Sequence, residues 1–156
     1  AARADVLVVD HDLDAAVWAA DCASIWLLTA SGRRIGVHAG WRGLADGVVD
    51  IAVAEVDATV CAAVLGPCIH HCCYEFGDAD RRRVAAGVGA DECAITSPTS
   101  WGRPGLDVPA AVAAALERHG IGLDAIGPCT GCDHTWFSHR VRRDAGRHAL
   151  IARVRR

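Results

Sequence analysis

The chain has 156 residues, of which 52% are hydrophobic and 22% are charged, and its formal net charge is −3. A chain of this length and apolar content can bury one sizeable core, so we expect a single domain over residues 1–156. The charge balance argues against a nucleic-acid partner, and no long apolar run or signal-peptide pattern predicts a membrane span or secretion. We therefore expect a cytoplasmic protein.

Four short apolar runs at the start of the chain predict β-strands. They cover residues 6–9, 15–20, 24–29 and 34–38. The Ser31-Gly32 step between the last two runs is typical of a turn, so we expect these strands to pair as a hairpin. After Arg42 the apolar spacing becomes helical and predicts a helix of about four turns that reaches Glu55.

The rest of the chain continues to alternate between strand and helix patterns. The expected elements are a buried strand at 61–65, helices at 78–86 and 106–119, and strands at 125–126 and 148–154. Asp78 and Asp107 are the expected N-caps of the two helices. This alternation predicts an α/β fold.

Cys22 and His38 flank the expected hairpin, which returns them to one end of the sheet. A thiolate and an imidazole are ligands that zinc prefers, and they can also form a thiol–imidazole catalytic pair. Either role predicts side chains within about 4 Å of each other. Asp21 is the expected partner that orients one of these groups or accepts a proton. The alternative is a buried core cysteine and a hydrogen-bonded histidine.

Arg42 stands at the start of the expected helix, after the Gly40 turn. A guanidinium beside a helix N-terminus suits a phosphate group, so Arg42 is a candidate phosphate-binding residue. The alternative is a surface arginine paired with Asp46 four residues later.

Two cysteine-rich segments suggest a structural zinc site. One contains Cys68, Cys72 and Cys73, and the other is Cys129-x-x-Cys132. Their spacing is not that of paired zinc knuckles, so we predict that these cysteines do not form a thiolate cage.

Several longer motifs resemble one protein family. His38-Ala39-Gly40-Trp41-Arg42-Gly43, preceded by Ala20-Asp21-Cys22, is similar to a motif of the YfiH family, also called the laccase-domain or multicopper polyphenol oxidase family. Further similar segments follow the family in order: Arg3-Ala4-Asp5, Leu65-Gly66-Pro67-Cys68-Ile69, Cys72-Cys73-Tyr74-Glu75-Phe76-Gly77, Cys129-Thr130, Phe137-Ser138-His139-Arg140 and Arg143-Asp144-Ala145-Gly146-Arg147.

The resemblance implies a two-sheet α/β/β/α sandwich, like that of the cytotoxic-necrotizing-factor type. It also implies a zinc-dependent purine nucleoside phosphorylase that converts adenosine or inosine and phosphate to the base and ribose 1-phosphate, with adenosine deamination as a second activity. Cys22 and His38 would be metal ligands, and Tyr74 and Arg140 would bind substrate. Copper fits less well, because one cysteine and one histidine cannot supply the ligands of a multicopper oxidase.

Two alternatives remain open. Cys22 could be the nucleophile and His38 the base of a metal-free deamidase, as in the cytotoxic necrotizing toxins. Alternatively, the chain could be a truncated domain without catalysis. The family's first zinc ligand lies in a Gln-Val-His-Gly motif upstream of Arg3 that is absent from this sequence, so we expect little phosphorolysis by these residues alone. His70 or His71 would be the substitute ligand if their turn folds over the site.

Overall fold

The apolar strands of the chain form a central five-stranded sheet. The computed structural model describes residues 4–10, 12–56 and 59–154. The strand order is β1-β4-β3-β5-β8, and only the β5–β8 pair is parallel. The strands are β1 (Val6–Val9), β4 (Arg34–Ala39), β3 (Ala23–Thr29), β5 (Val60–Leu65) and β8 (Leu123–Ala125). The expected β3–β4 hairpin is confirmed.

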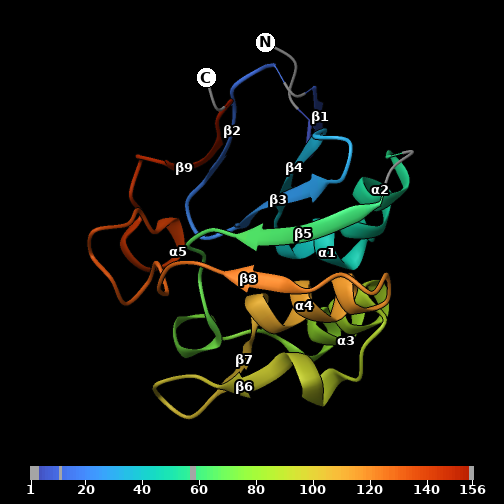
Figure 1. The fold of residues 1–156 in the computed structure, drawn as a ribbon. Coiled ribbons are helices and arrows are strands. Elements are labelled where there is room, and N and C mark those ends of the chain that lie inside the picture. The colour runs from blue at the N-terminus through green and yellow to red at the C-terminus, as the bar shows by residue number, and fades with distance from the viewer. Residues whose placement is uncertain (1–3, 11, 57–58, 155–156) are drawn as a thin grey trace.

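Both faces of this sheet are covered, which explains why β3 is buried along nearly its whole length. Helices pack on one face (Figure 1). They are α1 (Trp41–Ala45), α2 (Val48–Ala54), α3 (Asp78–Val88) and α4 (Val108–Glu117). The main core lies between these helices and the sheet.

The single helix expected after Arg42 is wrong, because the segment forms two short helices. Gly47 separates α1 from α2 with a left-handed backbone, φ 75°. This conformation is inexpensive for glycine and ends a helix. A second glycine sets the packing here: a Cβ added at Gly87 of α3 would lie 2.3 Å from the carbonyl oxygen of Ala45, so α1 and α3 approach closely.

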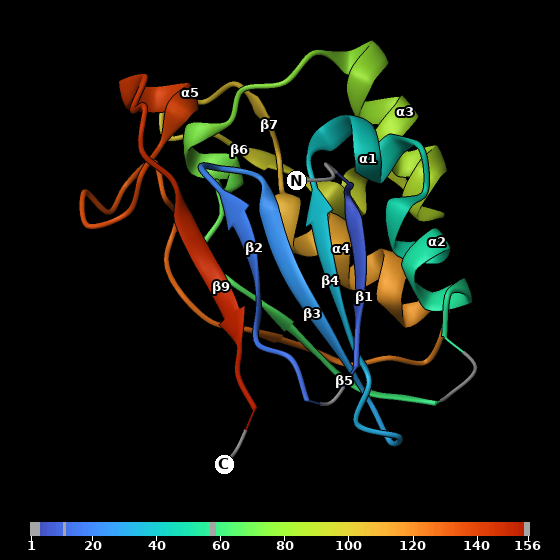
Figure 2. The ribbon, with the colours of Figure 1, turned by 90° about the horizontal axis from the view of Figure 1, so that it is seen from above.

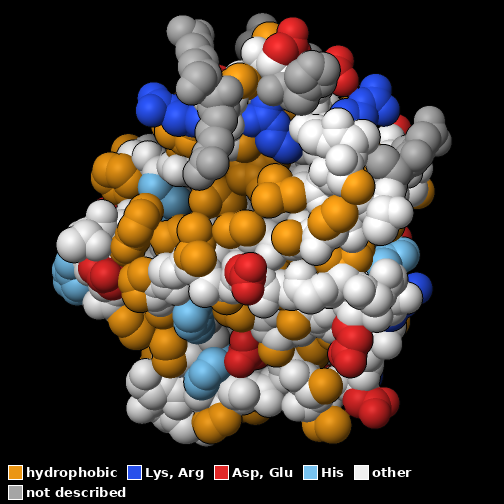
Figure 3. Space-filling view, in the orientation of Figure 1, with side chains coloured by type: hydrophobic (Ala, Val, Ile, Leu, Met, Phe, Trp, Pro, Cys, Tyr) orange, Lys and Arg blue, Asp and Glu red, His pale blue; other side chains and the backbone are white. Residues whose placement is uncertain are grey.

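A two-stranded antiparallel sheet of β2 (Ala15–Ala19) and β9 (His148–Ala152) covers the other face of the central sheet (Figure 2). Val17 and Trp26 pack between the two sheets, and the Trp26 indole donates a hydrogen bond to the Leu150 carbonyl at 2.9 Å. The predicted α/β class with packed sheets is therefore confirmed. Hydrophobic side chains gather over the β9 side of the molecule (Figure 3), and Trp18 and Ile151 are among the exposed ones.

Five short elements were not predicted, because their apolar residues follow no periodic pattern. They are β6 (Thr96–Pro98), β7 (Pro104–Leu106), the 3₁₀ helices η1 (His71–Cys73) and η2 (Glu92–Ile95), and α5 (His139–Arg142). Asp107 caps α4 as expected and accepts a hydrogen bond from the Ala110 amide at 3.1 Å. The expected Asp78 cap is wrong, because Gly77 is the N-cap of α3 and Asp78 is its first helical residue.

Within the described part of the chain, no helix has both the length and the apolar character that a membrane crossing requires.

Candidate active site

The β3–β4 register brings Cys22 and His38 together. His38 lies directly opposite Ser24, and Cys22 lies two residues before Ser24, just outside β3. Side chains two residues apart on a strand share a face, so Cys22 and His38 are diagonal neighbours on one face. Their side chains lie close enough for Cys22 to be the main cause of the raised pKa of His38.

His38 has a second partner, the carboxylate of Asp5. The two groups lie 2.9 Å apart, between His38 Nδ1 and Asp5 Oδ1. The interaction of the imidazole with the Cys22 sulfur is the largest cause that raises the pKa of His38, burial opposes it, and the hydrogen bond to Asp5 adds to it, so that the pKa rises from 6.5 to about 9. Asp5 was not among the predicted site residues. The sequence feature from which it could have been predicted is the family-like motif Arg3-Ala4-Asp5. It reaches His38 because β1 pairs with β4.

Asp21 has partners other than Cys22 and His38. One carboxylate oxygen accepts a hydrogen bond from the Thr130 hydroxyl at 2.7 Å, and the other accepts one from the Arg140 backbone amide at 2.6 Å. Asp21 is buried and has a left-handed backbone with φ 90°. It therefore ties the turn before Cys22 to two C-terminal segments, and the carboxylate that orients His38 is that of Asp5.

A small pocket of about 190 Å³ opens beside Cys22. Its walls include Trp41, Tyr74 and Arg140. The Arg140 guanidinium lies 4.6 Å from the centre of the Tyr74 ring. The structure therefore brings the predicted residues Cys22, Tyr74 and Arg140 to one place.

Arg42 lies next to this pocket. Its guanidinium lies 4.3 Å from the centre of the Trp41 ring, and the side chain is exposed. The alternative pairing with Asp46 is not formed within the described residues, where the ion pair of Asp46 is with Arg83 at 3.9 Å.

An open hollow of about 820 Å³ lies on the other side of the pair, between β1, β2 and β4. His38, Asp5 and Arg147 line it together with apolar side chains. The Cys22–His38 pair thus stands between two hollows, with the thiol at one and the imidazole at the other.

The sequence matches the family described as multi-copper polyphenol oxidoreductase laccase over residues 1–155. This chain belongs to that family. A Streptomyces coelicolor protein named purine nucleoside phosphorylase is 40% identical over 151 residues, which cover 92% of this chain and 61% of the relative. A Xylella fastidiosa protein of the same name is 37% identical, with coverage of 96% and 66%.

Two solved structures have a fold similar to that of this chain. A Neisseria meningitidis protein superposes with a TM-score of 0.80 at 29% identity, over 95% of this chain and 64% of that one. A Bacillus licheniformis protein titled YfiH gives 0.78 at 26% identity, over 94% and 60%. The chain spans about three-fifths of the length of these relatives.

For a member of this family, the chemistry of Cys22 and His38 suits part of a zinc site. Asp5 occupies Nδ1 of His38, which leaves Nε2 for a metal, as in the carboxylate–histidine–zinc arrangement. Catalytic zinc usually has three protein ligands. The described residues bring no third histidine, cysteine or acidic donor close enough to this pair to form such a group. His71, one of the two predicted substitute ligands, interacts with a different segment, because its Nδ1 lies 2.8 Å from the Pro98 carbonyl oxygen.

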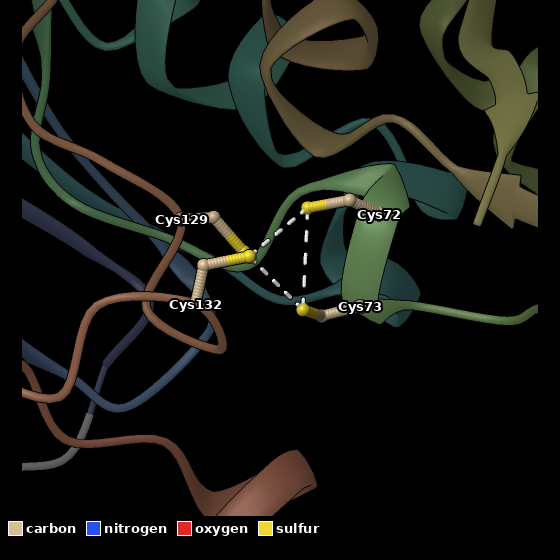
Figure 4. A group of neighbouring side chains, drawn as sticks. All are labelled: Cys72, Cys73, Cys129 and Cys132. Atoms are coloured by element: carbon tan, nitrogen blue, oxygen red, sulfur yellow. Dashed lines mark hydrogen bonds between the residues drawn. The ribbon is translucent and has the colours of Figure 1, made fainter. Parts of the chain in front are cut away.

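We predicted that the other cysteines form no thiolate cage, but the fold brings four of them together. The sulfurs of Cys72, Cys73, Cys129 and Cys132 all lie within 4.8 Å of one another (Figure 4). Cys68 is not a member of this group. It is buried in the main core, and burial is the main reason that the pKa of its thiol is raised. Spacing along the sequence does not reveal this proximity, because tertiary contacts rather than paired knuckles bring the two segments together.

Proposed function

We propose that this chain forms the main part of a cytoplasmic purine nucleoside phosphorylase that uses zinc and converts adenosine or inosine and phosphate to the base and ribose 1-phosphate. The observation that carries the proposal is the Cys22–His38 pair, whose thiol lies at a pocket lined by Tyr74 and Arg140. The names of the two similar bacterial proteins support the same reaction.

Side chains at and beside the pocket can bind the purine base and the phosphate. The flat ring of Trp41, which is half-buried, offers a surface on which a purine base can stack, whereas the ring of Tyr74 is buried and lies against Arg140. An arginine lies against each of these rings, Arg42 on Trp41 and Arg140 on Tyr74. Guanidinium groups bind phosphate in a bidentate manner, so these two arginines would hold the attacking phosphate close to the stacked base.

Cys22 and His38 would supply two metal ligands, and a third ligand would come from outside the described residues. When bound, zinc would polarise a substrate group or activate a water for adenosine deamination. Asp5 would fix the tautomer of His38 by accepting from its Nδ1–H. Asp21 would hold Arg140 at the pocket through the backbone amide of that residue.

The test is adenine release from adenosine and phosphate, measured with and without added zinc. We expect little turnover by this chain alone and a large increase when an upstream segment with the Gln-Val-His-Gly motif is joined to it. His38→Ala and Cys22→Ala should abolish that activity, whereas Cys93→Ala, which changes an exposed cysteine, should retain it. The proposal is wrong if the joined protein shows no phosphorolysis, or if Cys22→Ala leaves its rate unchanged.

One observation favours a second candidate, a metal-free cysteine hydrolase or deamidase. The interaction in which the protonated imidazole of His38 donates to the Cys22 sulfur raises the pKa of His38 to about 9, and the same interaction is a property of a thiolate–imidazolium catalytic pair. A chelator distinguishes the two candidates. It should abolish phosphorolysis, whereas it would leave the reaction of Cys22 with an amide substrate unchanged.

A further inference from the structure

We infer that Cys72, Cys73, Cys129 and Cys132 form a second metal site that holds one structural zinc ion, separate from the Cys22–His38 pair. The inference does not depend on the proposed reaction, because it rests on the geometry of a different cluster.

The spacing of the sulfurs suits a single tetrahedral ion. A zinc–sulfur bond of about 2.3 Å places tetrahedral sulfur ligands about 3.8 Å apart. Cys132 Sγ lies 3.5 Å from Cys72 Sγ and 3.4 Å from Cys73 Sγ, and the latter two are 4.0 Å apart. All four sulfurs converge on one point between the loops (Figure 4).

The backbone around Cys129 is shaped for this role. The amides of Cys132 and Asp133 both donate to the Cys129 carbonyl, at 3.1 and 3.0 Å, and close a tight turn between the two cysteines. The backbone amide of His70 points at Cys129 Sγ from 3.3 Å. An N–H group aimed at sulfur stabilises a thiolate, the form that binds metal.

Gly131 allows the other half of the cluster to approach. A Cβ at this position would lie 2.7 Å from Cys73 Cβ and 2.9 Å from Cys73 Sγ. Any larger residue would push η1 away from the Cys129–Cys132 turn. The neighbouring backbone fixes the same approach, because Cys68 and Cys129 form a parallel β-bridge.

A disulfide explains this arrangement less well. Bonded sulfurs are about 2.05 Å apart and need only two cysteines, whereas four sulfurs share this point at separations that leave space for an ion. Four thiolates in a tetrahedral arrangement favour zinc or a single iron over magnesium or calcium.

The site would stabilise the walls of the pocket. Tyr74 follows η1 directly, and Thr130, which follows Cys129, donates to Asp21. A metal bound to all four sulfurs would therefore cross-link the segment that carries Tyr74 to the one that holds Asp21, and loss of the metal should loosen both.

The test measures the zinc content of the reduced, purified chain together with its thermal unfolding. We expect one tightly bound zinc ion that Cys22→Ala retains and that Cys73→Ser and Cys132→Ser lose, with a lower Tm in both serine variants. Cys61→Ser and Cys93→Ser are matched controls, because both cysteines are exposed and outside the cluster, and should leave zinc and Tm unchanged.

A second measurement covers the case in which the serine variants fail to fold. Cobalt added to the metal-free wild-type chain should give the absorption of a tetrahedral tetrathiolate site, and zinc should protect the four cluster cysteines from alkylation more than Cys61 and Cys93. The inference is overturned if Cys73→Ser and Cys132→Ser retain full zinc, if cobalt binds without sulfur-to-metal bands, or if the cluster cysteines form a disulfide and the reduced chain takes up no metal.

Discussion

The Cys22–His38 pair and the four-cysteine cluster are assembled in different ways. Local strand pairing brings Cys22 and His38 together, because β3 and β4 are consecutive strands of one hairpin. The cluster joins η1 to the loop that carries Cys129 and Cys132, and Cys132 lies 59 or 60 residues further along the chain than Cys73 and Cys72. Hydrophobic patterning therefore reveals the first arrangement, whereas the second depends on how the loops meet in three dimensions.

Asp21 connects the two regions, so its removal should have the largest effect. Asp21→Ala would leave the buried Thr130 hydroxyl and the Arg140 amide without their acceptor. Hydrogen bonds to a charged group contribute about 1.5–3 kcal/mol each, so we expect a loss of about 3 kcal/mol in the free energy of unfolding. Urea unfolding measures this loss.

Asp21→Asn is the matched control, because it retains one acceptor oxygen and tolerates the left-handed backbone. It should lose less stability than Asp21→Ala. If Asp21→Ala were as stable as the wild type, the two regions would not be connected through this carboxylate.

In metal-free protein, the Cys22–His38 pair should make the free energy of unfolding depend on pH, with an effect smaller than that of Asp21→Ala. Because the folded-state pKa of His38 is raised from 6.5 to about 9, the pair stabilises the fold fully below pH 6.5, and this contribution disappears as the pH rises through about 9. The side chain is 36% exposed, so solvent screening reduces the effect to about 1 kcal/mol.

Unfolding of chelator-treated protein between pH 6 and about 9.5 measures this effect. Cys22→Ala removes the largest cause of the shift and should flatten most of the profile. An equal slope in that variant would show that Cys22 does not hold the proton on His38.

Thr29 tests the stability of the hairpin apart from either site. It lies at the opposite end of β3 from Cys22, where its hydroxyl donates to the Arg33 carbonyl at 2.8 Å. Thr29→Val preserves the shape and removes this hydrogen bond together with the one between the Thr29 and Ser31 hydroxyls at 3.0 Å. Ser31 is exposed and can bond water instead, so we expect a loss of about 1 kcal/mol in unfolding experiments. The zinc content should not change. If it falls, metal binding depends on general stability rather than on the cluster.

The sequence was most informative where a pattern is local. Periodicity located most strands and the Asp107 cap, and the hairpin placed Cys22 beside His38. It was least informative about non-local pairing: Asp5 reaches His38 through the β1–β4 pair, 33 residues away. Gly47 interrupted a helical pattern that apolar spacing alone does not distinguish from a continuous helix.

The contacts of the C-terminal segment have a consequence for the order of folding. Trp26 bonds Leu150 across 124 residues, Asp21 bonds Arg140 across 119, and β2 pairs with β9 in a two-stranded sheet. Contacts this distant in sequence form late, since the closure of a long loop must precede them. During synthesis, the helices and the β3–β4 hairpin can form while β2 still lacks a partner. The candidate active site and the cysteine cluster would then become complete together, when residues 129–152 have left the ribosome.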